Sequence, residues 1–204
     1  MKGQLSIEFM IVFTGLLIIF ATITMPLYNQ SRLDAEKVTK IAEAREAANA
    51  LVGALNTIYA SGPGSKLTIE YSLPQGVAAV YLGGYERLDV DGLIATGGRV
   101  PINGRADVQI LLDFNGDGAW DGNREAVVLV DTILPSRWDE NSVELDDSWV
   151  DENCVHVEEN LKVGFSYGTL TQRTIHRTTL TYNFTPSFVY PRRILIIDEI
   201  VGGT

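Results

Sequence analysis

The sequence predicts an α+β protein, in which one long N-terminal helix, first hydrophobic and then amphipathic, precedes a β-rich, sandwich-like globular head. Three observations predict this class. Residues 9–28 carry no charge, apolar residues then recur every three or four positions as far as Tyr59, and beyond a Gly/Pro-rich break the apolar pattern alternates with a period of two. We expect the helix over residues 4–60 and the head over residues 61–204.

The uncharged segment predicts a membrane-inserted helix. Residues 9–25 span about 25 Å as a helix, close to the hydrocarbon thickness of a bilayer. Lys2 lies on the short N-terminal side, which favours a cytoplasmic N-terminus and places the chain after Arg32 outside. A cleaved secretory signal is an alternative, although the apolar segment is long and no small-x-small motif follows it. A plain membrane anchor is another.

The pattern predicts that the helix continues beyond the apolar segment. From Ile41 to Tyr59 an apolar stripe alternates with charged residues and many alanines, as in an amphipathic helix. Pro26 is the only interruption, and proline removes one backbone hydrogen bond inside a helix. We therefore expect one helix of roughly 80 Å, bent near Pro26. The glycines and the proline of residues 61–65 end it.

The rest of the sequence predicts strands. The candidate strands are short, rich in β-branched and aromatic residues, and separated by Gly, Pro and Asn. They lie at residues 67–73, 77–82, 106–114, 125–134, 155–167, 173–184 and 193–201. Strands at this spacing favour a sandwich or a small barrel-like sheet. The acidic segment 136–153 is expected to be a solvated loop.

Composition and motifs narrow the function. The chain has 16 Lys and Arg against 26 Asp and Glu, a net charge of −10, which argues against a nucleic-acid partner because such proteins need a basic face. We find no H-E-x-x-H, P-loop or dinucleotide-binding motif and no supported Ser/His/Asp order, so we predict that the protein is not an enzyme. The lone Cys154 is interpreted as a small buried strand residue. A Cys/His nucleophile with His156 or His176 is the alternative.

A short motif immediately precedes the apolar segment, and it reads Lys2-Gly3-Gln4-Leu5-Ser6-Ile7-Glu8-Phe9. A basic residue and a glycine come first, then a polar stretch with one carboxylate, then the hydrophobic helix. The small-residue position suited to cleavage lies before the apolar segment, after Gly3. Cleavage there removes the basic residue and leaves the hydrophobic helix on the mature chain.

This arrangement resembles the class III signal peptide of type IV pilin-like proteins, and its Gln-x-Ser-x-Glu-Phe form is similar to that of archaeal pilins. The resemblance covers roughly residues 1–25. It implies cleavage between Gly3 and Gln4 by a membrane-embedded prepilin peptidase. It also implies assembly by a cytoplasmic ATPase and a membrane platform protein, with the helices in the filament core and the heads outside. The first mature residue is usually Phe in the bacterial branch, so Gln4 favours the archaeal one.

The resemblance gives Glu8, the fifth mature residue, and the neighbouring Phe9 a role in assembly. A carboxylate among packed apolar helices is costly unless it is paired, and the new N-terminal amine of a neighbouring copy is the nearest partner. The alternative is a solvated carboxylate that the helix dipole favours near the helix start.

The function expected from the resemblance is that of a structural subunit of an extracellular filament, used in adhesion or surface attachment. The subunit is membrane-inserted before assembly and forms a homopolymer afterwards. The alternatives are a minor pilin, an archaellin-like subunit and a membrane-anchored extracellular binding module.

A calcium site is predicted in the head. Oxygen-bearing side chains alternate before Gly118, and the spacing matches the first nine positions of an EF-hand-like loop. The expected ligands are Asp113, Asn115, Asp117, the carbonyl of Ala119, and Asp121. The twelfth position is Arg124 and strand-like segments flank the loop, so calcium would join two strands. An ordinary Asn/Asp/Gly turn is the alternative.

Two N-x-[ST] triplets predict glycosylation of an extracellular chain, at Asn29 and Asn183. Asn183 is the stronger candidate, because a glycan on Asn29 would interfere with the packing of helices just beyond the apolar segment.

Overall fold

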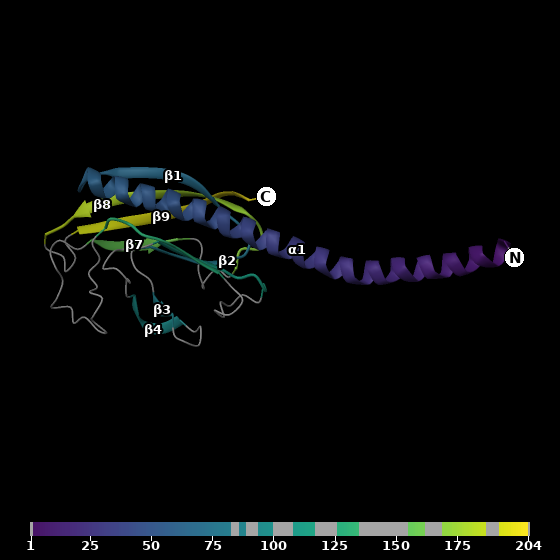
Figure 1. Ribbon diagram of the computed structural model, residues 1–204. Helices are drawn as coiled ribbons and strands as arrows, with labels where there is room; N and C mark the ends of the chain where they lie inside the picture. Colours follow the sequence, from purple (N-terminus) through teal and green to yellow (C-terminus); the bar gives the residue numbers. More distant parts are fainter. Residues whose placement is uncertain are drawn as a thin grey trace. The chain divides into compact units, whose positions relative to one another are not determined.

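The computed structural model of this 204-residue chain has one long helix followed by strands, which confirms the predicted α+β class (Figure 1). It describes residues 2–82, 86–88, 94–99, 108–116, 126–134, 155–161, 169–186 and 192–203. The elements are α1 (Lys2–Ser61), β1 (Lys66–Leu73), β2 (Val77–Leu82), β3 (Glu86–Leu88), β4 (Ile94–Arg99), β5 (Val108–Leu112), β6 (Ala126–Val130), β7 (His156–Asn160), β8 (Thr174–Phe184) and β9 (Arg192–Gly203). The chain divides into two compact units, Met1–Thr39 and Lys40–Thr204.

Helix α1 continues through Pro26 as a single element. It ends where the sequence predicts, because Gly62 takes a positive φ of 81° and its N–H donates to the Tyr59 carbonyl at 3.1 Å. The hydroxyl of Ser65 donates to the carbonyls of Ile58 and Gly62, at 3.1 and 2.7 Å. The bonds to Ile58 and Tyr59 satisfy carbonyls that the last turn of a helix leaves without partners, and the bond to Gly62 closes the turn that follows.

The described strands form two larger sheets and one small pair. The first sheet has the order β1-β8-β9-β7, in which β1 and β8 and also β8 and β9 pair antiparallel, whereas β7 pairs parallel to β9. The second sheet is antiparallel, in the order β2-β5-β6, and β3 pairs with β4. Along β8 buried and more exposed residues alternate, so one face of the first sheet lies on the core.

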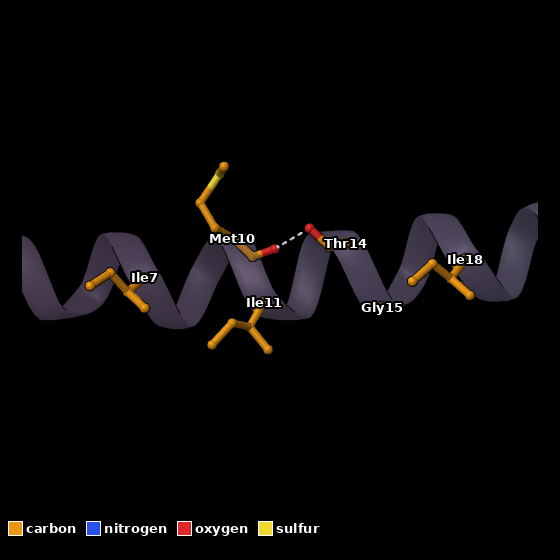
Figure 2. A pocket seen from close by; sticks show the side chains of 6 residues that line it. All are labelled: Ile7, Met10, Ile11, Thr14, Gly15 and Ile18. Atoms are coloured by element: carbon orange, nitrogen blue, oxygen red, sulfur yellow. Dashed lines mark hydrogen bonds between the residues drawn. The ribbon is translucent and has the colours of Figure 1, made fainter.

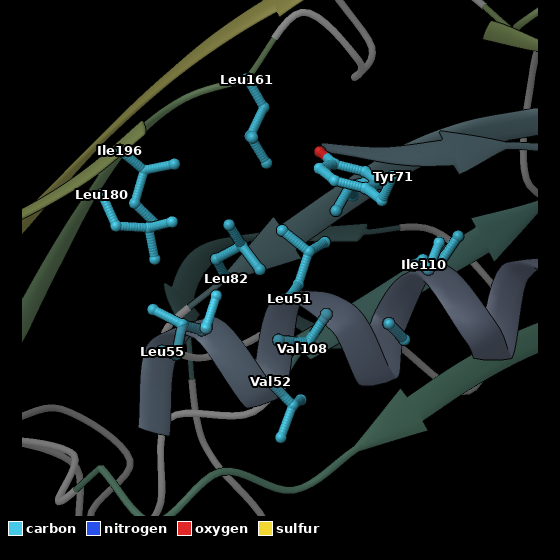
Figure 3. Close-up of a cluster of buried hydrophobic side chains, with 14 of the residues drawn as sticks. Leu51, Val52, Leu55, Tyr71, Leu82, Val108, Ile110, Leu161, Leu180 and Ile196 are labelled. Carbon is cyan, nitrogen blue, oxygen red and sulfur yellow. The ribbon is translucent and has the colours of Figure 1, made fainter. Parts of the chain in front are cut away.

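The core of the second unit includes the last part of α1. Leu51, Leu55 and Ile58 are at most 1% exposed and belong to one buried cluster with residues of both larger sheets. Figure 3 shows Leu51 and Leu55 in this cluster, together with Leu180 of the first sheet and Val108 of the second. The head expected over residues 61–204 therefore takes part of its core from the preceding helix, and the compact unit begins at Lys40.

Candidate functional site

The first part of α1 carries an uncovered apolar surface. Fifteen large hydrophobic side chains are 48% to 70% exposed: Ile7, Phe9, Met10, Ile11, Val12, Phe13, Leu16, Leu17, Ile18, Ile19, Phe20, Ile23, Met25, Leu27 and Tyr28. From here on, the apolar segment means residues 7–28, in which Glu8 is the only charged residue. Soluble monomers rarely expose apolar patches of more than a few hundred Å², and larger ones mark membrane or protein contacts. The apolar segment is therefore the candidate functional site.

The apolar segment has the length and composition of a membrane span. The stretch Ile7–Ser61 contains an 18-residue window with a mean hydropathy of 2.3, and none of that window is buried within the chain. A long apolar helix near the N-terminus is compatible with a membrane anchor and with a signal sequence. The predicted apolar helix is present, and its membrane role stays a prediction.

The threonines of the apolar segment bond within their own helix. Thr14 donates to the Met10 carbonyl at 2.7 Å, and Thr24 donates to the Phe20 carbonyl at 2.7 Å. The Thr22 hydroxyl donates to the Ile19 carbonyl at 2.8 Å. Polar groups without partners are costly in an apolar medium. Since these hydroxyls are already satisfied, the segment suits both lipid and a packed bundle of helices.

One face of the segment is hollowed at Gly15. Ile7, Met10, Ile11, Thr14, Gly15 and Ile18 line a shallow apolar hollow. Figure 2 shows Ile7 and Ile18 at its two ends along the helix, with Met10 and Ile11 at its sides. A Cβ placed on Gly15 would have no atom within 4 Å, so the space above it is open. Elsewhere on the helix, the rings of Phe9 and Phe13 stack with centroids 6.1 Å apart and planes 14° apart.

Glu8 is exposed on α1 and is the only charged residue between Gly3 and Arg32. Gly3 and Gln4 belong to the first turn of α1, while the side chains of residues 2–6 lie outside the described part of the chain. The predicted cleavage position and the predicted pairing of Glu8 both stay predictions.

Of the predicted calcium ligands, the structure describes Asp113 and Asn115, while Asp117, Ala119 and Asp121 lie outside the described residues. Asp113 is buried, and its Oδ1 accepts the Gly116 N–H at 2.6 Å. Its Oδ2 accepts the Thr169 hydroxyl at 3.0 Å. Both oxygens thus hold a turn and a neighbouring segment together.

Asn115, by contrast, is exposed. Among the described residues no group of three or more His, Cys, Asp or Glu side chains is placed to hold a metal ion. With three of the expected ligands outside those residues, the calcium site stays a prediction.

The two glycosylation candidates differ in exposure. Asn29 is exposed on α1, whereas Asn183 is half-buried near the end of β8 and pairs with Arg193 of β9. The structure thus leaves Asn29 the more accessible amide of the two. Glycosylation itself stays a prediction at both positions.

A buried polar network joins three strands of the first sheet, and sequence reasoning missed it. His176 Nδ1 lies 2.7 Å from Asp198 Oδ2, and His176 Nε2 lies 2.8 Å from Thr174 Oγ1. Thr178 donates to Asp198 Oδ1 at 2.6 Å, and the Tyr71 hydroxyl lies 3.3 Å from Thr178 Oγ1. The Tyr71 ring also stacks on the imidazole, with centroids 5.6 Å apart. Burial and the charge of Asp198 raise the pKa of Tyr71 well above the usual tyrosine range.

The network has the hydroxyl, imidazole and carboxylate order of an activated nucleophile. Thr174 is 6% exposed, His176 is completely buried and Asp198 is 3% exposed, so the three groups have little access to a substrate. We interpret them as a structural network. The signal that points to it is the polar alternation along β8, which turns Thr174, His176 and Thr178 inward. Cys154 and the side chain of His156 lie outside the described residues.

Comparison of the chain with protein-family models, with curated proteins and with solved structures finds no match in any of the three. The function of the apolar segment therefore has to be inferred from its own residues and geometry.

Proposed function

We propose that the chain is a structural subunit of an extracellular type IV pilus-like filament that serves adhesion or surface attachment. The observation that carries this proposal is the apolar segment, exposed all round and directly preceded by the Lys2-Gly3-Gln4 motif. A signal that is cut before its hydrophobic helix leaves that helix on the mature protein. The helix then anchors the subunit in the membrane first and packs against other copies later.

The energetics favour a change of surroundings for the apolar segment rather than exposure to water. Removing apolar surface from water stabilises the protein by about 25 cal/mol of free energy per Å², and both lipid and a bundle of copies remove it from water. Within the bundle, packing and polar contacts decide which arrangement forms. The satisfied threonine hydroxyls allow the transfer from lipid to bundle without breaking a hydrogen bond.

Glu8 is the polar group that distinguishes the two surroundings. In the membrane precursor its carboxylate lies near the helix start, where water and the helix dipole stabilise it. In the bundle it needs a positive partner, and the amine of Gln4 exposed by cleavage in a neighbouring copy supplies one. The proposal thus implies further copies of the chain as partners, and the resemblance to type IV pilin-like proteins implies a prepilin peptidase, an assembly ATPase and a platform protein. Catalysis is not part of the proposal.

The test is negative-stain microscopy of cells that express the gene, together with the intact mass of material sheared from them. We expect filaments whose subunit lacks residues 1–3, so that loss of Lys2 changes the net charge from −10 to −11. Gly3→Leu is expected to block cleavage and filaments together. A mature chain that begins after Met25 would point to a secretory signal. An uncleaved monomer in the membrane would favour the anchored binding module.

A further inference from the structure

The apolar segment has two unlike faces. At about 100° of rotation per residue, Ile7, Ile11, Thr14 and Ile18 share one side of the helix. Phe9, Phe13 and Phe20 fall together on roughly the opposite side by the same rule. We call the first side the hollow face, because it carries the hollow at Gly15, and the second the aromatic ridge.

The two faces are complementary in shape. On the hollow face Gly15 carries no side chain, and the space that a Cβ would enter is empty for at least 4 Å (Figure 2). On the aromatic ridge, Phe9 and Phe20 are 67% and 66% exposed, and Phe13 stacks on Phe9. A hollow beside aliphatic side chains accepts a planar ring, as the knob of one helix enters a hole of another.

The apolar area of the segment exceeds what one standard contact covers. An aromatic side chain buries about 150 to 250 Å², so one that is half to two-thirds exposed offers about 100 Å², and an aliphatic one offers about half as much. The fifteen exposed side chains, four of them aromatic, therefore offer on the order of 1,000 Å², and a standard interface takes about 800 Å² from each partner. One contact of standard size thus leaves apolar surface for a second neighbour.

We propose that the aromatic ridge of one copy seats in the Gly15 hollow of a second copy. This contact joins two different faces. The copy that contributes its aromatic ridge still has its hollow face free, and the copy that contributes its hollow face still has its ridge free. Such a heterologous contact repeats without limit unless its rotation closes a ring, so it is a kind of contact that can build an open filament. The inference rests on the proposed filament function and adds which faces meet.

Paired cysteines test the contact in filaments of the full-length chain. In a Cys154→Ser background, Thr14→Cys, which lines the hollow without filling it, is combined in turn with Phe9→Cys, Phe13→Cys or Phe20→Cys, and intact filaments are oxidised with copper phenanthroline. We expect at least one pair to give a ladder of dimers, trimers and larger oligomers on a non-reducing gel. Each single-cysteine chain is expected to stay monomeric, because its one thiol faces no second thiol within disulfide distance.

The outcomes separate the two proposals. Filaments without a ladder from any of the three pairs would overturn the ridge-in-hollow contact and leave the filament function standing. Dimers from Phe9→Cys, Phe13→Cys or Phe20→Cys alone would show that ridge meets ridge, which also overturns it. Absence of filaments from the unaltered chain would overturn the proposed function and the contact together.

Filling the hollow is an independent test with a matched control. Gly15→Leu and Gly53→Leu both introduce a side chain where no atom lies within 4 Å of the new Cβ, so neither strains its own subunit. We expect Gly15→Leu to reduce sheared filaments about tenfold or more while the processed subunit stays in the membrane, since tenfold corresponds to about 1.4 kcal/mol per contact. Gly53→Leu is expected to assemble normally. Normal filaments from Gly15→Leu would contradict the contact.

Discussion

His176 Nδ1 on β8 lies 2.7 Å from Asp198 Oδ2 on β9, and both side chains are fully shielded from solvent. The pair lies beside the shift in register between Ile175 and His176, where β8 and β9 pair irregularly. A buried carboxylate without partners is strongly unfavourable, whereas Asp198 holds one bond from each of two side chains on β8. The network therefore fixes β8 and β9 relative to each other at the point where their regular pairing is interrupted.

Removing the carboxylate should destabilise the head strongly. Asp198→Ala leaves the buried imidazole and the Thr178 hydroxyl without their acceptor, and breaking a buried pair from one side costs about 3–5 kcal/mol. The measurement is the urea unfolding of a fragment covering residues 40–204, with tryptophan fluorescence as the signal. Glu70→Ala is the control, because its pair with Arg177 is half-exposed and such pairs contribute about 1 kcal/mol or less. Equal losses from the two substitutions would contradict the structural role of the network.

The buried tyrosine of the network predicts a loss of stability at alkaline pH. The raised pKa of Tyr71 means that the folded state keeps the phenolic proton after the unfolded chain has lost it. The unfolding free energy should therefore be constant below the ordinary tyrosine pKa of about 10 and fall as the pH rises above it.

Tyr71→Phe removes this titration and should flatten the alkaline decline, at a cost of about 1 kcal/mol at neutral pH for the lost hydrogen bond. Urea unfolding between pH 8 and pH 11 measures both effects, with pH values chosen around that pKa. An unchanged slope in Tyr71→Phe would assign the decline to other tyrosines, such as Tyr182, whose pKa burial also raises.

The core predicts where a stable head begins. A fragment of residues 40–204 should fold and remain monomeric, because it keeps the buried side chains of α1 and lacks the apolar segment. A fragment of residues 61–204 should fail to fold cooperatively. Leu55→Ala should cost about 2–5 kcal/mol, as for other buried leucines, whereas Ile133→Ala, at an exposed position, should change stability by about 0.5 kcal/mol or less. Cooperative unfolding of the shorter fragment would contradict the shared core.

Glu8→Ala should separate processing from assembly. The peptidase is expected to need the small residue before the cut, so the processed subunit should accumulate in the membrane. Filaments should fall about tenfold or more, since each factor of ten corresponds to about 1.4 kcal/mol and a lost buried pair exceeds that. The assay compares processed subunit in membranes with subunit in sheared filaments, and Glu36→Ala on the same helix is the control. Wild-type yields from Glu8→Ala would show that the carboxylate needs no partner.

Calcium should raise the melting temperature of the 40–204 fragment if the predicted loop binds it. An ion at a hundred times its dissociation constant adds about 2.7 kcal/mol to the stability of the folded state. Melts with calcium, with magnesium and with a chelator measure the effect, and Asp121→Asn should abolish it. Identical melts in calcium and chelator would leave Asp113 as the centre of an ordinary turn, bonded to Gly116 and Thr169.

Local signals in the sequence predicted local structure well. The Gly-Pro-Gly break marks the end of α1 at Ser61, and alternation places β2 at Val77–Leu82 as predicted. The predicted strand 173–184 is confirmed as Thr174–Phe184. Of the strands that the structure describes, those not predicted are β3 (Glu86–Leu88), which has three residues, and β4 (Ile94–Arg99), which has two adjacent glycines. Neither carries a usable periodic pattern.

Contacts between distant parts of the chain could not be predicted from the sequence in the same way. The stripe from Ile41 to Tyr59 predicts that the helix packs on something, but the pattern does not say that its partners are both sheets of the head. Nor does any local signal give the parallel pairing of β7 with β9. The same holds for the buried polar network. Alternation along β8 predicts that His176 points inward, but only the pairing of β8 with β9 brings Asp198 next to it. In the apolar segment, composition predicted exposure, whereas the stacking of Phe9 on Phe13 required side-chain conformations.

The position of β9 in its sheet has a consequence for biosynthesis. Residues 192–203 form an inner strand, between β8 and β7, although they follow every other described strand in the chain. Among the described strands β7 pairs only with β9. The strand to which β7 pairs is therefore synthesised more than thirty residues after β7 itself. Contacts between distant parts of a chain form late and slowly. The first sheet therefore cannot be completed before the last described strand has been synthesised, and a chain truncated before Arg192 would lack the strand that joins β8 to β7.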